Sequence, residues 1–170
     1  MKMYTETELV AMDSKADVAV KAMTVTGVGI GFAPVMIDIA ALMAAMGAGV
    51  VAIGACYQMK VNKEDAGELI KQFFKAAGLT FSMVFAGQKI VGSLMKSNPA
   101  TYLPFMITDA IVCGASAYAV GSTSQKYFRR RAQGKTASAA EIKQWMAEGK
   151  QQGKGFAKAQ ADQRAKASQA

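Results

Sequence analysis

The chain has 170 residues, 52% of them hydrophobic, with 16 Gly, 12 Met, 2 Cys and no His, which suits one domain with short additional segments. Without His the commonest general base and metal ligand are missing, and the two cysteines are far apart, so no catalytic residue, metal site or cofactor is expected. The net charge is +8, and residues 126–170 carry all of this excess. A neutral apolar body with a basic end predicts an anionic partner, either lipid headgroups or nucleic acid.

Residues 1–21 form the first predicted element, a polar and partly amphipathic surface helix. Its apolar residues recur at spacings near three and four. The stretch GVGIGFAP that follows contains several glycines and Pro34, which disfavour a continuous helix. We therefore expect a break there, and then a long helix from about Val35 to Met59 in which Asp38 is the one charged residue.

Two further long helices are predicted after Lys60. Asn62 and Asp65 form a capping-box pair at the start of a helix that we expect to continue through LTFSMVFAGQKIVGSLMK, a rod of about 50 Å. After Pro99 an apolar helix carries Asp109 and ends at QKYFRRR. A second capping-box pair, Ser138 and Glu141, begins a short amphipathic helix, and the remainder reads as a low-complexity tail.

These elements predict an all-α fold, a membrane-associated bundle of three to four apolar helices. We divide the chain into an amphipathic N-terminal segment (1–21), a helical hydrophobic domain (22–131) and a basic cytoplasmic tail (132–170). Three stretches approach the roughly 20 apolar residues that a helix needs to cross a bilayer. The pattern favours a membrane bundle over a soluble one.

Three ionisable residues lie in or beside these apolar stretches: Asp38, Lys89 and Asp109. A charge at the centre of a membrane span costs about 2.5 to 3.5 kcal/mol, so these are the candidate intramembrane polar residues. Lys89 is the one cation among them and is a natural partner for either aspartate. The alternative, in which each charge reaches the headgroups independently, stays open.

Small residues recur at intervals of about four in the apolar helices. Such stripes let helix backbones approach closely in lipid, although tightly packed soluble bundles use them too. The proposed helix-packing positions are Ala40, Ala44, Ala48, Ala52, Gly78, Ser82, Ala86, Ala117 and Gly121.

A basic cluster follows the last apolar helix, and we expect it to face the cytoplasm and to bind an anionic leaflet or a partner protein. It consists of Arg129, Arg130, Arg131 and Lys135. The string RRRAQGKT ends like a phosphate-binding loop, but Arg129 occupies the place of the required first glycine, so nucleotide binding is not expected. Nucleic acid is not expected as a partner of the same region, because Gln, Ala and Gly dilute its basic residues.

From Pro34 to Phe128 the chain resembles the DUF697 family, a hydrophobic domain found beside or fused to bacterial membrane-associated GTPases. The resemblance rests on PVMIDIAALM, GACY, VNKEDAGELIKQF, GQKIVGSLMKSNP and AYAVGSTSQKYF. It implies a helical, membrane-associated accessory domain and, by association alone, a GTPase partner. The longer, Leu-rich helices usual in the family are replaced here by Ala, Gly and Met.

The sequence thus favours a non-enzymatic membrane protein that acts as a scaffold or adaptor subunit of a homo-oligomer or larger assembly. We expect it in the bacterial inner membrane with a cytoplasmic C-terminus. One alternative is an ion- or proton-conducting subunit whose three ionisable residues line a polar path. Another is a soluble helical subunit of a large complex.

Overall fold

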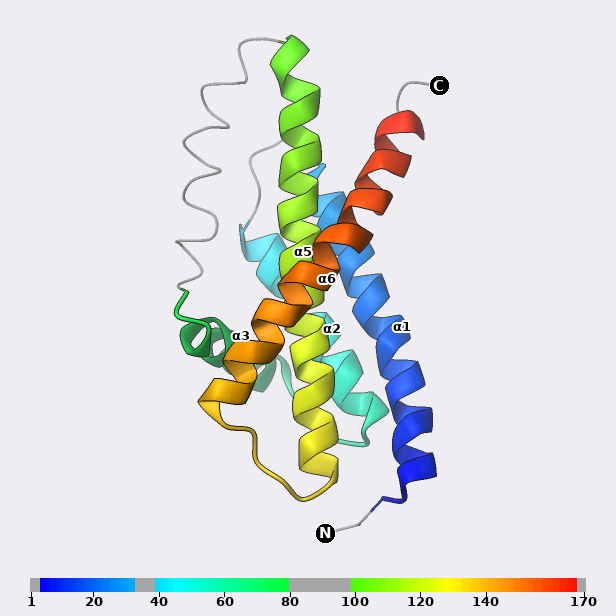
Figure 1. Cartoon of the computed structure of the whole chain (residues 1–170), viewed down its shortest axis with the longest axis vertical. Helices are drawn as coiled ribbons and strands as arrows, with labels where there is room; N and C mark the ends of the chain where they lie inside the picture. Colours follow the sequence, from blue (N-terminus) through cyan, green and yellow to red (C-terminus); the bar gives the residue numbers. More distant parts are fainter. Residues whose placement is uncertain (1–3, 33–38, 80–98, 168–170) are drawn as a thin grey trace.

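The computed structural model describes residues 4–32, 39–79 and 99–167 (Figure 1). Regular structure in these ranges is entirely helical, which confirms the predicted all-α fold. The elements are α1 (Glu6–Gly31), α2 (Ile39–Cys56), α3 (Lys63–Ala76), α5 (Pro99–Ala132) and α6 (Ala139–Ala167).

The helix α5 is the centre of the bundle. The helices α1 and α6 pack along it, with α6 crossing in front of α5 in Figure 1, and α2 lies behind, against α1 and α5. The short helix α3 lies at the side and contacts α2 and α6. The core between them is filled by apolar side chains from all these helices, the largest of which include Leu9, Leu42, Met46, Ile53, Ile70, Phe73 and Phe128.

The helix α1 extends further than its sequence predicted. It begins at a capping box, in which Thr5 accepts a hydrogen bond from the Glu8 amide, and it continues through the glycines to Gly31 instead of ending near residue 21. Gly31 faces α5 so closely that a methyl group on it would lie 2.5 Å from the Cα of Ala110. Packing against α5 therefore outweighs the helix cost of glycine, about 1 kcal/mol each, and the predicted boundary at 21 falls inside one helix.

The helix α3 ends earlier than predicted. Its capping box of Asn62 and Asp65 is confirmed, but the helix ends at Ala76. Gly78 adopts a φ of 72°, its amide donates to the Lys75 carbonyl, and the Leu79 amide donates to the Phe74 carbonyl. This is a Schellman motif, which ends a helix by turning the chain away, so the expected continuous rod of about 50 Å is wrong.

The helix α6 takes the place of most of the expected low-complexity tail. It has 29 residues, and its buried face consists of Ile142, Met146, Gly149, Gly153, Ala157, Ala161 and Ala165. The small residues bring its backbone close to α5, because a methyl group on Gly153 would lie 3.1 Å from the Cα of Ala115. The basic residues of this region are thus the outer face of a packed helix.

Candidate membrane interface

The apolar helix α2 is left partly uncovered by the rest of the described chain. Its 18 residues contain no charged side chain and extend about 27 Å, close to the roughly 30 Å of a bilayer's hydrocarbon core. The segment Pro104–Ala132 of α5 is also long and apolar enough to cross a membrane. The two differ in burial: 28% of α2 is buried, against 61% of the most apolar part of α5. Length and composition thus qualify both helices, but of the two, α2 has the larger share of residues that the described part of the chain leaves unburied.

The two faces of α2 are chemically distinct. Its inner face is formed by Leu42, Met46, Val50 and Ile53, all buried against α1, α3 and α5. Its outer face carries the predicted packing residues Ala40, Ala44, Ala48 and Ala52, and all four side chains are exposed. These alanines form a ridge that points outward, suited to acyl chains or to a helix of another subunit.

The other predicted packing positions have different surroundings. Ala117 and Gly121 of α5 are buried against α1, where a methyl group on Gly121 would lie 2.5 Å from Met23 Cε. Gly78 is exposed and ends α3, as described above. Ser82 and Ala86 lie outside the described residues.

Of the three candidate intramembrane charges, the structure describes one. Asp109 is 6% exposed on α5, and its Oδ1 has no hydrogen-bond partner among the described residues. Asp38 and Lys89 lie outside the described residues, so a pair between Lys89 and either aspartate stays a prediction.

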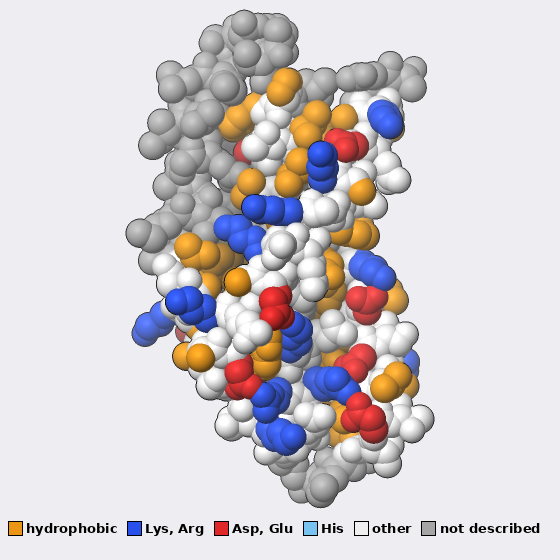
Figure 2. Space-filling model, viewed as in Figure 1, with side chains coloured by type: hydrophobic (Ala, Val, Ile, Leu, Met, Phe, Trp, Pro, Cys, Tyr) orange, Lys and Arg blue, Asp and Glu red, His pale blue; other side chains and the backbone are white. Residues whose placement is uncertain are grey.

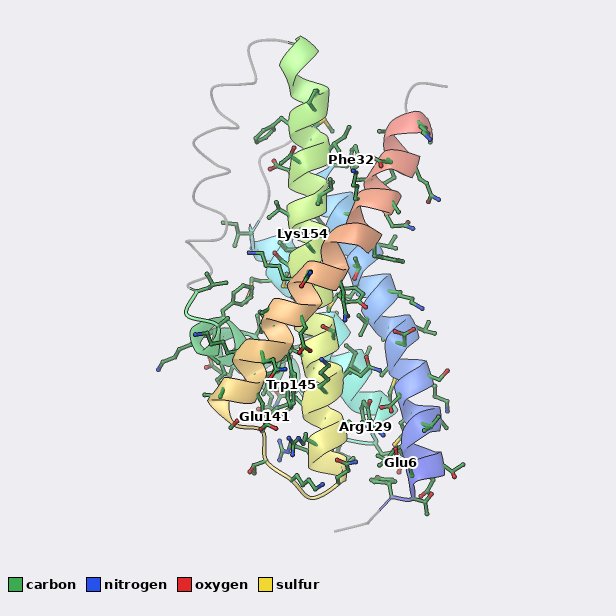
Figure 3. All side chains as sticks on the ribbon, in the orientation of Figure 1. Glu6, Phe32, Arg129, Glu141, Trp145 and Lys154 are labelled. Atoms are coloured by element: carbon green, nitrogen blue, oxygen red, sulfur yellow. The ribbon has the colours of Figure 1, made fainter. Side chains whose placement is uncertain are left out.

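Two of the four residues in the predicted basic cluster form ion pairs within the chain. Arg129 pairs with Glu6 and with Asp13, and Arg130 pairs with Glu141. Figure 3 shows Arg129, Glu6 and Glu141 at one end of the bundle. The guanidinium carbon of Arg131 lies 5.9 Å from the centre of the Tyr127 ring, and Lys135 is exposed. Arg131 and Lys135 are therefore the members of the cluster that are most available to an outside anion.

A polar network that the sequence analysis missed ties three helices together at this end. Asp13 of α1 accepts a hydrogen bond from the Tyr57 hydroxyl, which follows α2, and its Oδ2 lies 3.2 Å from Arg129 Nε of α5. Gln125 of α5 donates to the backbone oxygen of Asp13 over 3.0 Å. Burial, together with the Asp13 carboxylate, raises the pKa of Tyr57, so its hydroxyl stays protonated and donating. The network holds one end of α2 in place, but nothing in the local sequence around Asp13 distinguishes it from a surface residue.

Comparison with known proteins identifies the family. Neither the curated proteins nor the solved structures gave a match. A family model described as "Domain of unknown function (DUF697)" matches residues 3–165, well beyond the stretch on which the sequence resemblance rests. The match includes α1 and nearly all of α6, so both helices lie within the family's domain. The chain belongs to the DUF697 family.

Proposed function

We propose that this protein is a non-enzymatic, membrane-associated helical subunit that acts as a scaffold or adaptor, with the outer face of α2 as its membrane and assembly surface. The observation that carries the proposal is the open, charge-free face of a helix that is 28% buried. A soluble monomer rarely leaves one face of so long an apolar helix uncovered. Small side chains on that face also favour close contact with another helix in lipid, and therefore a homo-oligomer or larger assembly.

The charged surface of the molecule supports a two-sided arrangement. Figure 2 shows Lys, Arg, Asp and Glu side chains distributed over α1 and α6, the face opposite α2. Charged side chains are favoured in contact with water, so we place α2 along the membrane surface with its outer face toward the acyl chains, and the charged faces of α1 and α6 toward the cytoplasm. Arg131 and Lys135 would then meet anionic headgroups of the bacterial inner membrane on the cytoplasmic side, consistent with the positive-inside rule.

A GTPase is the partner that family context suggests, and the adaptor role follows from it. A charged cytoplasmic face on a membrane-bound bundle would provide a docking surface for such a partner near the bilayer. Nucleic acid is not part of the proposal.

The proposal is tested by flotation of the protein with vesicles that contain anionic lipid, followed by carbonate extraction. We expect wild-type protein to float and to resist carbonate. Ala48→Glu places a charge in the middle of the exposed α2 face and is expected to lower membrane partitioning roughly a hundredfold, given the cost of a charge inside a bilayer. Ser14→Glu, on the exposed face of α1, is the matched control and should float like wild type.

Wild-type protein that stays monodisperse without detergent and never floats would contradict the proposal and favour the soluble subunit of a large complex. Circular dichroism of both variants checks that each one remains helical, so that a loss of flotation reports on the surface and not on unfolding.

An ion- or proton-conducting role is the second candidate, and Asp109 is the observation that favours it. Carboxylates within membrane segments often mark ion pathways or proton relays, and Oδ1 of Asp109 has no hydrogen-bond partner among the described residues. Proton flux into proteoliposomes that disappears in Asp109→Asn would support this role, whereas flux-free vesicles would leave the scaffold role.

A further inference from the structure

A cavity of about 180 Å³ lies between α3, α5 and α6. Its wall is mostly apolar and includes Phe74, Ala77, Leu79, Ala119 and Met146, with the hydroxyl-bearing Ser116 among them. Ser116 is 6% exposed. Two exposed lysines of α6, Lys143 and Lys150, complete the lining. An apolar interior with cations at its edge is suited to a ligand with the opposite charge pattern.

A second hollow, of about 500 Å³, adjoins this cavity, because Phe74 and Leu79 line both. It lies between α2 and α3 and is also lined by Met43, Ile70, Lys71, Lys75 and Gly78. Met43 belongs to α2, so the second hollow lies between the membrane-facing helix and the cavity beneath α6.

The charged residues around the two hollows are all positive. All four charged residues that line them are lysines, with no carboxylate among the described lining residues. Lys71 is neutralised by Glu68, with 2.6 Å between Nζ and Oε1. Lys75, Lys143 and Lys150 form no ion pair with a described residue, so their charge is available to an outside anion.

We propose that this site binds an anionic lipid, with a segment of an acyl chain in the cavity and the phosphate of its headgroup held by Lys143 and Lys150. The volume is close to that of a cavity that holds one benzene molecule, about 150 Å³, and is below the roughly 300 Å³ at which drug-sized pockets begin. It therefore admits a segment of a slender hydrocarbon chain and excludes a helix of a partner protein. The proposal rests on the proposed membrane association for the source of the lipid.

Native mass spectrometry of the full chain in a non-ionic detergent tests the site, with dioleoyl phosphatidic acid and dioleoyl phosphatidylcholine as probes. We expect a saturable preference for phosphatidic acid. The double variant Lys143→Ala/Lys150→Ala should bind it about thirtyfold more weakly, given the usual contribution of lysines near anionic lipid. The matched control, Lys158→Ala/Lys166→Ala, removes two exposed α6 lysines that line neither hollow and should bind like wild type.

A second pair of variants tests the acyl chain. Ala147 is exposed at the cavity, so Ala147→Leu fills it without unpacking the core, and we expect at least a fivefold loss of phosphatidic acid binding. Ala140→Leu, at an exposed α6 position away from the cavity, should have no effect. Equal binding of the two lipids, or an equal loss in both lysine double variants, would overturn the proposal. If the protein bound lipid in detergent but never floated with vesicles, the proposed function would be contradicted and the lipid site would still stand.

Discussion

Asp13 is the residue at which three helices meet, since it contacts Tyr57, Gln125 and Arg129. A hydrogen bond to a charged group contributes about 1.5 to 3 kcal/mol, so Tyr57→Phe should lower the free energy of unfolding by about that amount. Denaturant or thermal unfolding in detergent measures the change. Tyr4→Phe is the control, because the Tyr4 hydroxyl donates over 3.3 Å to an uncharged acceptor, Gln58, in an exposed bond. An equal effect of the two substitutions would contradict a special role for Tyr57.

The pKa of Tyr57 predicts how stability depends on pH. Because folding raises this pKa above its value in the unfolded chain, about 10, the stabilisation from the protonated hydroxyl is complete below pH 10 and is lost as the pH rises further. We expect the unfolding midpoint of the wild type to fall more steeply above pH 10 than that of Tyr57→Phe. Parallel pH profiles of the two proteins would show that Tyr57 ionises equally in both states.

Asp109 predicts an unusual stabilising substitution. Asp109 is buried and its Oδ1 has no hydrogen-bond partner among the described residues, which costs free energy, so Asp109→Asn should raise the free energy of unfolding by about 1 to 3 kcal/mol. The free energy of unfolding of the two proteins is compared at neutral pH. Destabilisation would instead indicate a partner, and a double-mutant cycle with Lys89→Met would then measure whether Lys89 is that partner.

Between elements, the contact of α5 with α6 depends on small residues. A methyl group on Gly153 would lie 2.7 Å from Tyr118 Cβ and 3.1 Å from Ala115 Cα, whereas one on Gly155 would have no neighbour within 4 Å. We expect Gly153→Ala to destabilise the protein by about 1 to 3 kcal/mol through overpacking. The matched Gly155→Ala should stabilise it by about 0.5 to 1 kcal/mol through helix propensity. If both variants shifted the unfolding midpoint in the same direction relative to wild type, close α5–α6 packing would be excluded as the cause.

The elements that the sequence predicted well are those with local signals. The capping boxes at Asn62 and at Ser138 are both present, because each needs only neighbouring residues. The continuation of α1 to Gly31 depends on contact with α5, and a local sequence pattern cannot predict that contact. The buried stripe of α6 was missed for a related reason: Gly and Ala are its main residues, and they add little to hydrophobic periodicity.

For the molecule as a whole, α2 and α5 have similarly apolar compositions but differ in how much of each is buried. The apolar runs in α2 and α5 both qualify as membrane spans, yet α5 is enclosed by α1, α2 and α6 while α2 lies at the edge. The sequence predicted the apolar stripe of alanines on α2 but not whether it would face inward. That distinction depends on the arrangement of the whole bundle, and it is what makes the α2 face the candidate membrane surface.

The enclosure of α5 predicts the effect of removing α6. If residues 139–170 were a basic appendage, a chain truncated after 138 would unfold like the full-length protein. Because α6 covers Ala115 and Ala119 and forms the Lys126–Glu148 ion pair of 2.7 Å, we expect the truncated chain to lose cooperative thermal unfolding or to aggregate. Lys158→Gln/Lys166→Gln removes α6 charge without unpacking the helix and should retain the wild-type transition. A truncated chain with an unchanged midpoint, measured by circular dichroism, would show that α5 is stable without α6 and that its burial contributes little to the fold.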